Sequence, residues 1–163
     1  RRLGLAAGPN LRAVLDRRLR TPPAARLFTV PGPVVIYTEV GEGPATAALE
    51  ERGANVVRLP RVEPEAVLAD LFRRGVKSVL VEGGGEVLAS FVASGLYDQV
   101  GVDCAPLLIG GQTARGPLGG AGFPTLAAAA RLEPLRAVRQ GGDLVLTAVR
   151  QGRVAEILTR VLP

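Results

Sequence analysis

The sequence predicts an α/β protein with a mostly parallel sheet, helices on the faces of that sheet, and antiparallel strands at the C-terminal end. In the first two-thirds of the chain, short apolar runs rich in β-branched residues alternate with helical patterns, as in parallel sheets. The final third holds two alternating runs joined at a pair of glycines, which is typical of a hairpin. With 163 residues, 47% of them hydrophobic, the chain is expected to form one domain over residues 1–163.

Four strands are expected in the parallel part, each a short apolar run closed by a turn, a proline or a charged residue. They cover residues 11–16, 34–38, 55–59 and 76–81. Three helices are expected between and after them, each ending near a glycine, which favours the backbone conformation that stops a helix. These helices cover residues 44–51, 63–74 and 85–94.

The C-terminal third is expected to be mainly antiparallel. Residues 99–104 and 107–109 are strand-like, and residues 110–124 form a glycine-rich loop. A hairpin of residues 131–139 and 144–150 is expected to turn at Gly141 and Gly142. A short helix over residues 153–162 would then lie within a C-terminal tail, residues 151–163.

Two absences exclude several classes of catalytic or metal site. The chain has no His and a single Cys, Cys104. A Ser-His-Asp triad, a Cys-His pair and a structural zinc site are therefore excluded, and so is a disulfide within the chain. Cys104, on an apolar strand, is expected to be a small core residue.

Charge and hydropathy predict neither a nucleic-acid nor a membrane partner. The net charge is +5, but the basic residues are scattered and not interleaved with stacking aromatics. No apolar run is long enough to span a bilayer and no signal-peptide pattern opens the chain, so a cytoplasmic protein is expected. Because the chain starts with Arg and contains no Met, it is expected to be N-terminally incomplete.

The most informative segment, residues 78–91, predicts a buried strand, a glycine turn and a helix. The glycines at 83–85 are expected to allow positive φ angles and close backbone approach. Free N–H groups and the helix dipole at the start of the helix favour a bound phosphate, beside which Glu82 places a carboxylate. The plainer alternative is a tight turn with Glu82 solvated or capping the helix. The turn is not the dinucleotide fingerprint, because Leu88 stands where that pattern needs glycine.

The order of motifs resembles a known family. Six motifs carry the resemblance: RAVLDRRLRTP at 12–22, VEGG at 81–84, LASF at 88–91, GLYDQV at 95–100, APLLIGG at 105–111 and GDLVL at 142–146. Together they resemble the C-terminal reductase domain of the bifunctional riboflavin-biosynthesis deaminase/reductase, over about residues 11–150. The resemblance implies the three-layer, dihydrofolate-reductase-like fold.

For function, the resemblance implies an NADPH-dependent oxidoreductase. The family reaction reduces 5-amino-6-(5-phosphoribosylamino)uracil to the ribitylamino product by hydride transfer to C1′ of the ring-opened imine. A homodimer is implied. The family's first strands and its zinc deaminase domain have no counterpart in the sequence, so the chain by itself is expected to hold an incomplete active site.

The resemblance also implies roles for particular residues. Glu82 matches the acid that contacts the substrate and favours a cationic iminium. The cofactor-binding turn and helix start match Gly84, Gly85, Glu86, Val87, Leu88, Ala89 and Ser90. Arg17 stands where the family more often has a small hydroxyl residue, and its guanidinium is suited to the 2′-phosphate of NADPH. No metal ligand is implied.

Two other functions stay open from the sequence. One is a related reductase of the same fold that acts on another substrate, such as a pteridine. The other is a non-catalytic nucleotide-binding domain. The plainer interpretation of the basic loop at residues 17–20 is a solvated turn.

Overall fold

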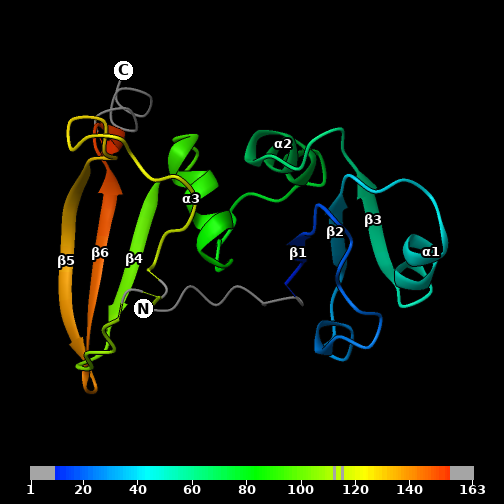
Figure 1. The fold of residues 1–163 in the computed structure, drawn as a ribbon, viewed down its shortest axis with the longest axis horizontal. Helices are drawn as coiled ribbons and strands as arrows, with labels where there is room; N and C mark the ends of the chain where they lie inside the picture. Colours follow the sequence, from blue (N-terminus) through cyan, green and yellow to red (C-terminus); the bar gives the residue numbers. More distant parts are fainter. Residues whose placement is uncertain (1–9, 112, 115, 155–163) are drawn as a thin grey trace. The chain divides into compact units, whose positions relative to one another are not determined.

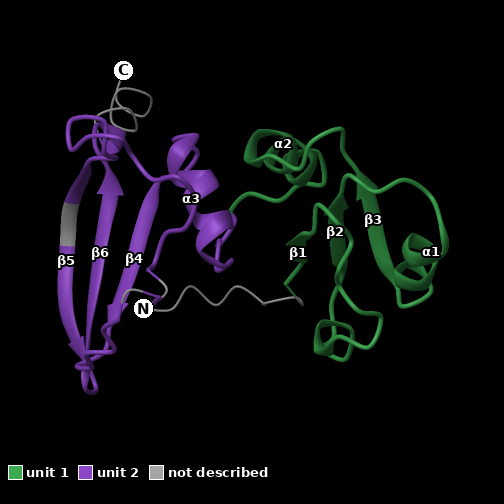
Figure 2. Cartoon of the chain, viewed as in Figure 1, with its two compact units in different colours: residues 1–78 green, residues 79–163 purple. Residues whose placement is uncertain are grey.

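The computed structural model describes residues 10–111, 113–114 and 116–154. The chain divides into two compact units, Arg1–Ser78 and Val79–Pro163 (Figure 2). The expectation of one domain over residues 1–163 stays a prediction. The α/β class is confirmed, with one parallel and one antiparallel sheet.

The first unit is a parallel α/β unit. Its three strands lie in the order β1-β2-β3 and are parallel to one another (Figure 1). The strands are β1 (Arg12–Leu15), β2 (Val34–Thr38) and β3 (Ala54–Arg58). The helices are the 3₁₀ turn η1 (Arg26–Phe28), α1 (Pro44–Glu50) and α2 (Pro64–Arg73).

The first unit has three layers, with the sheet between α1 on one face and α2 on the other. Every residue of β2 is buried, as expected of a central strand that carries an unbroken apolar run. On one face, Tyr37 lies in a cluster with Val67 of α2. On the other, Ile36 lies in a cluster with Leu49 of α1. Helices therefore cover both faces of this sheet.

A polar network lies at the edge of the α2 layer. The hydroxyl of Tyr37 donates to Asp70 Oδ2 at 2.9 Å. Arg74 Nε also donates to Asp70 Oδ2, and Arg74 Nη2 donates to Asn55 Oδ1 at 3.0 Å. Burial by itself would raise the pKa of Asp70, but hydrogen bonds from Arg74 and Tyr37 and the nearby arginine charges outweigh it, so that pKa lies below its usual value. The network ties α2 to β2 and β3.

The second unit combines one helix with an antiparallel sheet. The helix is α3 (Gly85–Ala93). The sheet has the order β4-β6-β5 and contains β4 (Gln99–Cys104), β5 (Leu132–Gln140) and β6 (Asp143–Arg150). The predicted β5–β6 hairpin is confirmed, and Gly141, with φ of +62°, makes the turn.

Three expectations are wrong, two for connecting segments and one for the last residue of β4. Residues 76–81 form no strand, because no strand among the described residues pairs with them. The N–H of Val76 instead donates to Leu71 O and closes α2, with Gly75 at φ +82°. Residues 107–109 also form no strand, and their side chains are exposed. Cys104 is exposed and does not lie in a core.

Two further expectations, a C-terminal helix and the absence of a membrane-spanning segment, can be compared only with the described residues. The predicted helix over residues 153–162 begins at residue 153, and its remainder lies outside the described residues. Within the described residues, no helix has the length and apolar character that crossing a bilayer requires.

The Tyr37–Asp70–Arg74 network leads to a stability prediction. Asp70→Asn should lower the free energy of unfolding by about 1–3 kcal/mol at pH 7, because a partly buried charged acceptor is lost. The folded-state pKa of Asp70 is lowered, so this contribution is present above the unfolded pKa of about 3.9 and is lost as pH falls below it. Urea unfolding at pH 7 and pH 3 measures both effects.

The difference between wild type and Asp70→Asn should therefore shrink at the lower pH. Glu63→Gln, which removes an exposed partner of Arg61, is the matched control and should change stability by less than about 1 kcal/mol. An Asp70→Asn difference that grew on acidification would contradict the assigned role.

Candidate functional site

The glycine turn before α3 differs from expectation in its backbone angles. Gly84 is the N-cap of α3, with φ of −59°. None of the glycines at 83–85 has a positive φ, so the expected left-handed conformation is wrong. At two of the three positions, glycine is needed because neighbouring atoms leave no space for a Cβ.

Two of the three glycines make close contacts within the chain. A Cβ on Gly83 would lie 2.8 Å from Cβ of Val87, and a Cβ on Gly85 would lie 2.8 Å from the backbone N of Gly119. A Cβ on Gly84 would meet no atom within 4 Å. Gly83 thus lies against the Val87 side chain and Gly85 against the Gly119 backbone, whereas Gly84 has open space beside its Cα. Close approach of this turn to a ligand stays a prediction.

A glycine loop crosses the first turn of α3. The N–H of Gly119 donates to Gly85 O at 2.9 Å, and the N–H of Gly120 donates to Glu86 Oε1 at 2.9 Å. A Cβ on Gly119 would lie 2.6 Å from Glu86 Oε1. The sequence predicts a glycine-rich loop here but does not predict this contact. The only signal was the density of glycines in residues 119–122.

The loop and the helix enclose a cavity of about 320 Å³. Glu86, Ala89 and Ser90 line it from α3, and residues 118–123 line it from the loop. The Ser90 hydroxyl donates to Val87 O at 2.7 Å, so its proton is engaged within the helix. Three of the predicted cofactor residues therefore face one cavity, whose volume lies in the range of small-molecule sites.

Glu82 lies in the segment before the turn. Its side chain is exposed, and among the described residues it makes no hydrogen bond or ion pair. A capping role for Glu82 is therefore not observed, since α3 has no side-chain cap at its N-terminus. The carboxylate is available to a ligand.

Arg17 lies in the first unit, directly after Asp16 at the C-terminal end of β1. Its Nε contacts Glu39 Oε1 at 3.1 Å. The hydroxyl of Thr38 donates to Arg17 O at 3.3 Å, which joins the ends of β1 and β2. Glu39 was not among the predicted site residues, although it directly follows the second parallel strand.

Asp16 organises the loop that Arg17 begins. Its carboxylate accepts from the N–H of Arg20 at 2.9 Å, and from the N–H and hydroxyl of Thr21 at 2.6 Å each. Burial would raise the pKa of Asp16, but the Thr21 hydroxyl and the backbone N–H groups lower it below its usual value. Leu19, with φ of +52°, is the strained point of this loop.

The predicted residues thus fall into two groups. Arg17 belongs to the first unit and lies with Glu39. Glu82 and residues 84–90 belong to the second unit, where Gly85, Glu86, Ala89 and Ser90 lie beside the loop of residues 118–123. The described residues contain no cluster of His, Cys, Asp and Glu suited to a metal ion.

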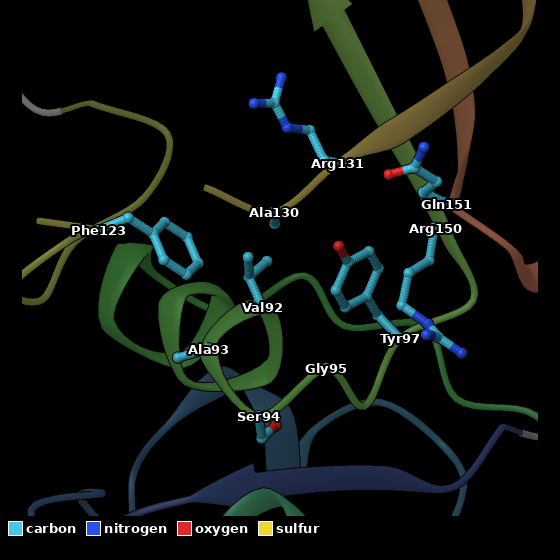
Figure 3. A pocket seen from close by; sticks show the side chains of 10 residues that line it. All are labelled: Val92, Ala93, Ser94, Gly95, Tyr97, Phe123, Ala130, Arg131, Arg150 and Gln151. Atoms are coloured by element: carbon cyan, nitrogen blue, oxygen red, sulfur yellow. The ribbon is translucent and has the colours of Figure 1, made fainter. Parts of the chain in front are cut away.

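A second cavity of about 380 Å³ lies at the other end of α3 (Figure 3). Phe123, Val92 and Tyr97 are among its lining residues, together with Arg131 and Gln151. In Figure 3 the rings of Phe123 and Tyr97 lie on different sides of Val92. None of the predicted site residues lines this cavity.

Comparison with known proteins identifies the family. The family model described as the RibD C-terminal domain matches residues 6–146. The chain belongs to this family. It is the reductase family of riboflavin biosynthesis, and a reductase of this kind takes its hydride from a nicotinamide cofactor.

Two curated relatives differ in how much of their own length the chain covers. It is 34% identical over 154 residues to the 2,5-diamino-6-ribosylamino-4(3H)-pyrimidinone 5′-phosphate reductase of Methanothermobacter thermautotrophicus, covering 93% of this chain and 71% of that protein. It is 34% identical over 152 residues to the riboflavin biosynthesis protein RibD of Bacillus amyloliquefaciens. That match covers 91% of this chain but only 41% of the relative.

Solved structures agree with the predicted fold. Acinetobacter baumannii RibD, form 2, matches with a TM-score of 0.73 and 26% identity, over 86% of this chain and 37% of that one. A Thermotoga maritima deaminase/reductase matches with a TM-score of 0.68 and 21% identity, over 90% of this chain and 40% of that one. The expected resemblance to the fold of the reductase domain is confirmed.

Because space for a Cβ is absent at Gly85 and present at Gly84, substitutions at these two positions should affect stability and cofactor binding differently. Gly85→Ala should destabilise the second unit by about 1–3 kcal/mol, because its Cβ would press on the Gly119 backbone. Gly84→Val should leave stability within about 1 kcal/mol of wild type, since its Cβ meets no protein atom. It should nevertheless weaken nicotinamide-cofactor binding by filling the space that a ligand needs.

Thermal unfolding and cofactor titration of the two variants measure these effects side by side. A folded Gly84→Val protein with the cofactor affinity of wild type would rule out the turn as the cofactor site.

Proposed function

We propose that the protein reduces a phosphoribosylaminopyrimidine of riboflavin biosynthesis, with NADPH as the reductant. The reaction opens the ribosylamine to an imine and delivers hydride to C1′, which gives the ribitylamino product. The observation that carries the proposal is the exposed carboxylate of Glu82, unengaged by any described residue, two residues before the open position Gly84. The names of the curated relatives support the same substrate class.

The residues present fit a nicotinamide dinucleotide. The space at Gly84 and the cavity beside Glu86, Ala89 and Ser90 offer an apolar recess next to a helix start. In the first unit, the Arg17 side chain is 59% exposed and supplies a guanidinium for a phosphate. When bound, NADPH supplies the hydride.

Glu82 acts on the substrate. When the ribosylamine opens and its nitrogen gains a proton, positive charge develops next to C1′, the atom that must accept hydride. A carboxylate held near that position stabilises the charge, and the ribityl hydroxyls give it further hydrogen bonds. Hydride transfer from a nicotinamide to this carbon needs no protein nucleophile.

The proposal also includes the oligomeric state and the cellular compartment of the protein. We infer a homodimer in the cytoplasm, as the family resemblance implies. Both pyrimidine forms, the uracil and the diaminopyrimidinone, carry the same phosphoribosylamino group on which the proposed chemistry takes place.

The role of Arg17 predicts a cofactor preference. The full-length protein should bind NADPH more tightly than NADH, because only NADPH carries the 2′-phosphate. Arg17→Ala should weaken NADPH by about tenfold and leave NADH within about twofold. Fluorescence titration with both reduced cofactors measures this, and Arg18→Ala removes the same charge one residue away as a control. Equal losses for the two cofactors would show that Arg17 does not contact the 2′-phosphate.

The role of Glu82 predicts a loss of turnover. Glu82→Gln keeps the shape and removes the charge, which should cost roughly 2–4 kcal/mol of transition-state stabilisation. That corresponds to a fall in kcat/KM of about thirty- to a thousandfold. Affinity for NADPH should stay near wild type, since the carboxylate serves the substrate.

The assay uses the full-length protein and both pyrimidine substrates. Glu50→Gln, an exposed carboxylate of α1, is the control and should retain activity. A Glu82→Gln protein with most of its activity on both substrates would remove Glu82 from the mechanism.

A further inference from the structure

Glu39 is the acidic partner of the residue proposed to bind the 2′-phosphate. It follows β2, and its Oε1 lies 3.1 Å from Arg17 Nε. The Glu39 side chain is 30% exposed and that of Arg17 is 59% exposed. The guanidinium that would receive a phosphate is therefore already paired with a carboxylate.

The Glu39 carboxylate has an anchor besides the Arg17 side chain. Its Oε1 also accepts the N–H of Val62 at 2.8 Å. A backbone bond also joins this strand end to its neighbour, since the N–H of Glu39 donates to Arg17 O at 3.2 Å. Glu39 is thus fixed on the sheet edge, whereas Arg17 is the more exposed partner.

The position and the charge of Glu39 bear on which ribose substituent, a 2′-hydroxyl or a 2′-phosphate, is favoured beside it. The C-terminal edge of a parallel sheet is where open α/β sheets bind their ligands. An acid at such a strand end accepts a hydrogen bond from a ribose 2′-hydroxyl, whereas a 2′-phosphate prefers an arginine. Here both groups stand side by side.

We propose that Glu39 is a specificity-determining residue that limits the preference for NADPH over NADH. It competes with the 2′-phosphate for the Arg17 guanidinium, while it tolerates the 2′-hydroxyl of NADH. This proposal rests on the proposed function, because it concerns the same cofactor. The effect reaches the phosphate through Arg17, so it disappears when Arg17 is removed.

The decisive variant is Glu39→Gln. Its amide oxygen can still accept the Val62 N–H, so the anchor at 2.8 Å is kept while the charge is lost. The dissociation constant for NADPH should fall about three- to tenfold, and that for NADH should stay within about twofold. Fluorescence titration of the full-length protein with each reduced cofactor gives both constants, and thermal unfolding confirms an intact fold. Glu39→Ser, smaller but still polar, should shift the preference in the same direction.

Two further variants make the test specific. Glu42→Gln removes a carboxylate from the same connection, one that pairs with Arg58 at 3.3 Å and is 83% exposed, and it should leave the NADPH-to-NADH ratio unchanged. In an Arg17→Ala background, Glu39→Gln should lose most of its effect on NADPH.

Three results would overturn the role of Glu39 alone: equal changes for both cofactors, the same gain in Glu42→Gln, or an undiminished gain without Arg17. Wild-type protein that binds neither cofactor would overturn the proposed function, and this assignment with it. A selective gain for NADPH that requires Arg17 supports both.

Discussion

The complete burial of β2 is the constraint on which the first unit depends. Because all five residues of this strand are buried, its position is set by neighbours on every side. The N–H of Asp16 donates to Tyr37 O at 2.8 Å, and the N–H of Leu59 donates to Thr38 O at 2.9 Å. The strand therefore fixes where β1 and β3 end. The pair of Arg17 and Glu39 is a consequence of that shared edge.

A backbone crossing organises the second unit. Gly85 and Gly119 approach so closely that neither can carry a side chain without displacing the other segment. The carboxylate of Glu86 adds a second bond, to the N–H of Gly120. The first turn of α3 is thus partly occupied by the protein's own backbone. Space for a ligand remains at Gly84 and in the cavity beside Ala89.

The sequence predicts those features that depend on local pattern. Apolar runs and glycine stops place β1 to β3, α1 to α3 and the β5–β6 hairpin within a residue or two of their observed bounds. The strand expected at residues 76–81 is wrong because an apolar run becomes a strand only where another strand pairs with it, and pairing is not a local property.

In the candidate site, too, the sequence predicts the local features but not the contacts between distant segments. The glycine turn can be located from sequence, but the lack of space at Gly85 cannot, since it depends on Gly119, which lies more than thirty residues further along the chain. The contact of Arg17 with Glu39 was missed for a similar reason, as the two are distant in the chain. One signal was present: both directly follow predicted parallel strands, whose C-terminal ends share an edge.

The division into two groups of residues bears on how a cofactor would be recognised. NADH and NADPH share the same pyrophosphate, so a glycine turn that accepts this group binds both and distinguishes neither. Only the 2′-phosphate differs, and it must be recognised by a charged side chain. The net charge of +5 does not by itself determine how strongly the 2′-phosphate is bound. An arginine that is already paired with a carboxylate attracts a phosphate less than an unpaired arginine does. Within the first unit, the proposed discrimination between the two cofactors therefore depends on the balance between Arg17 and Glu39.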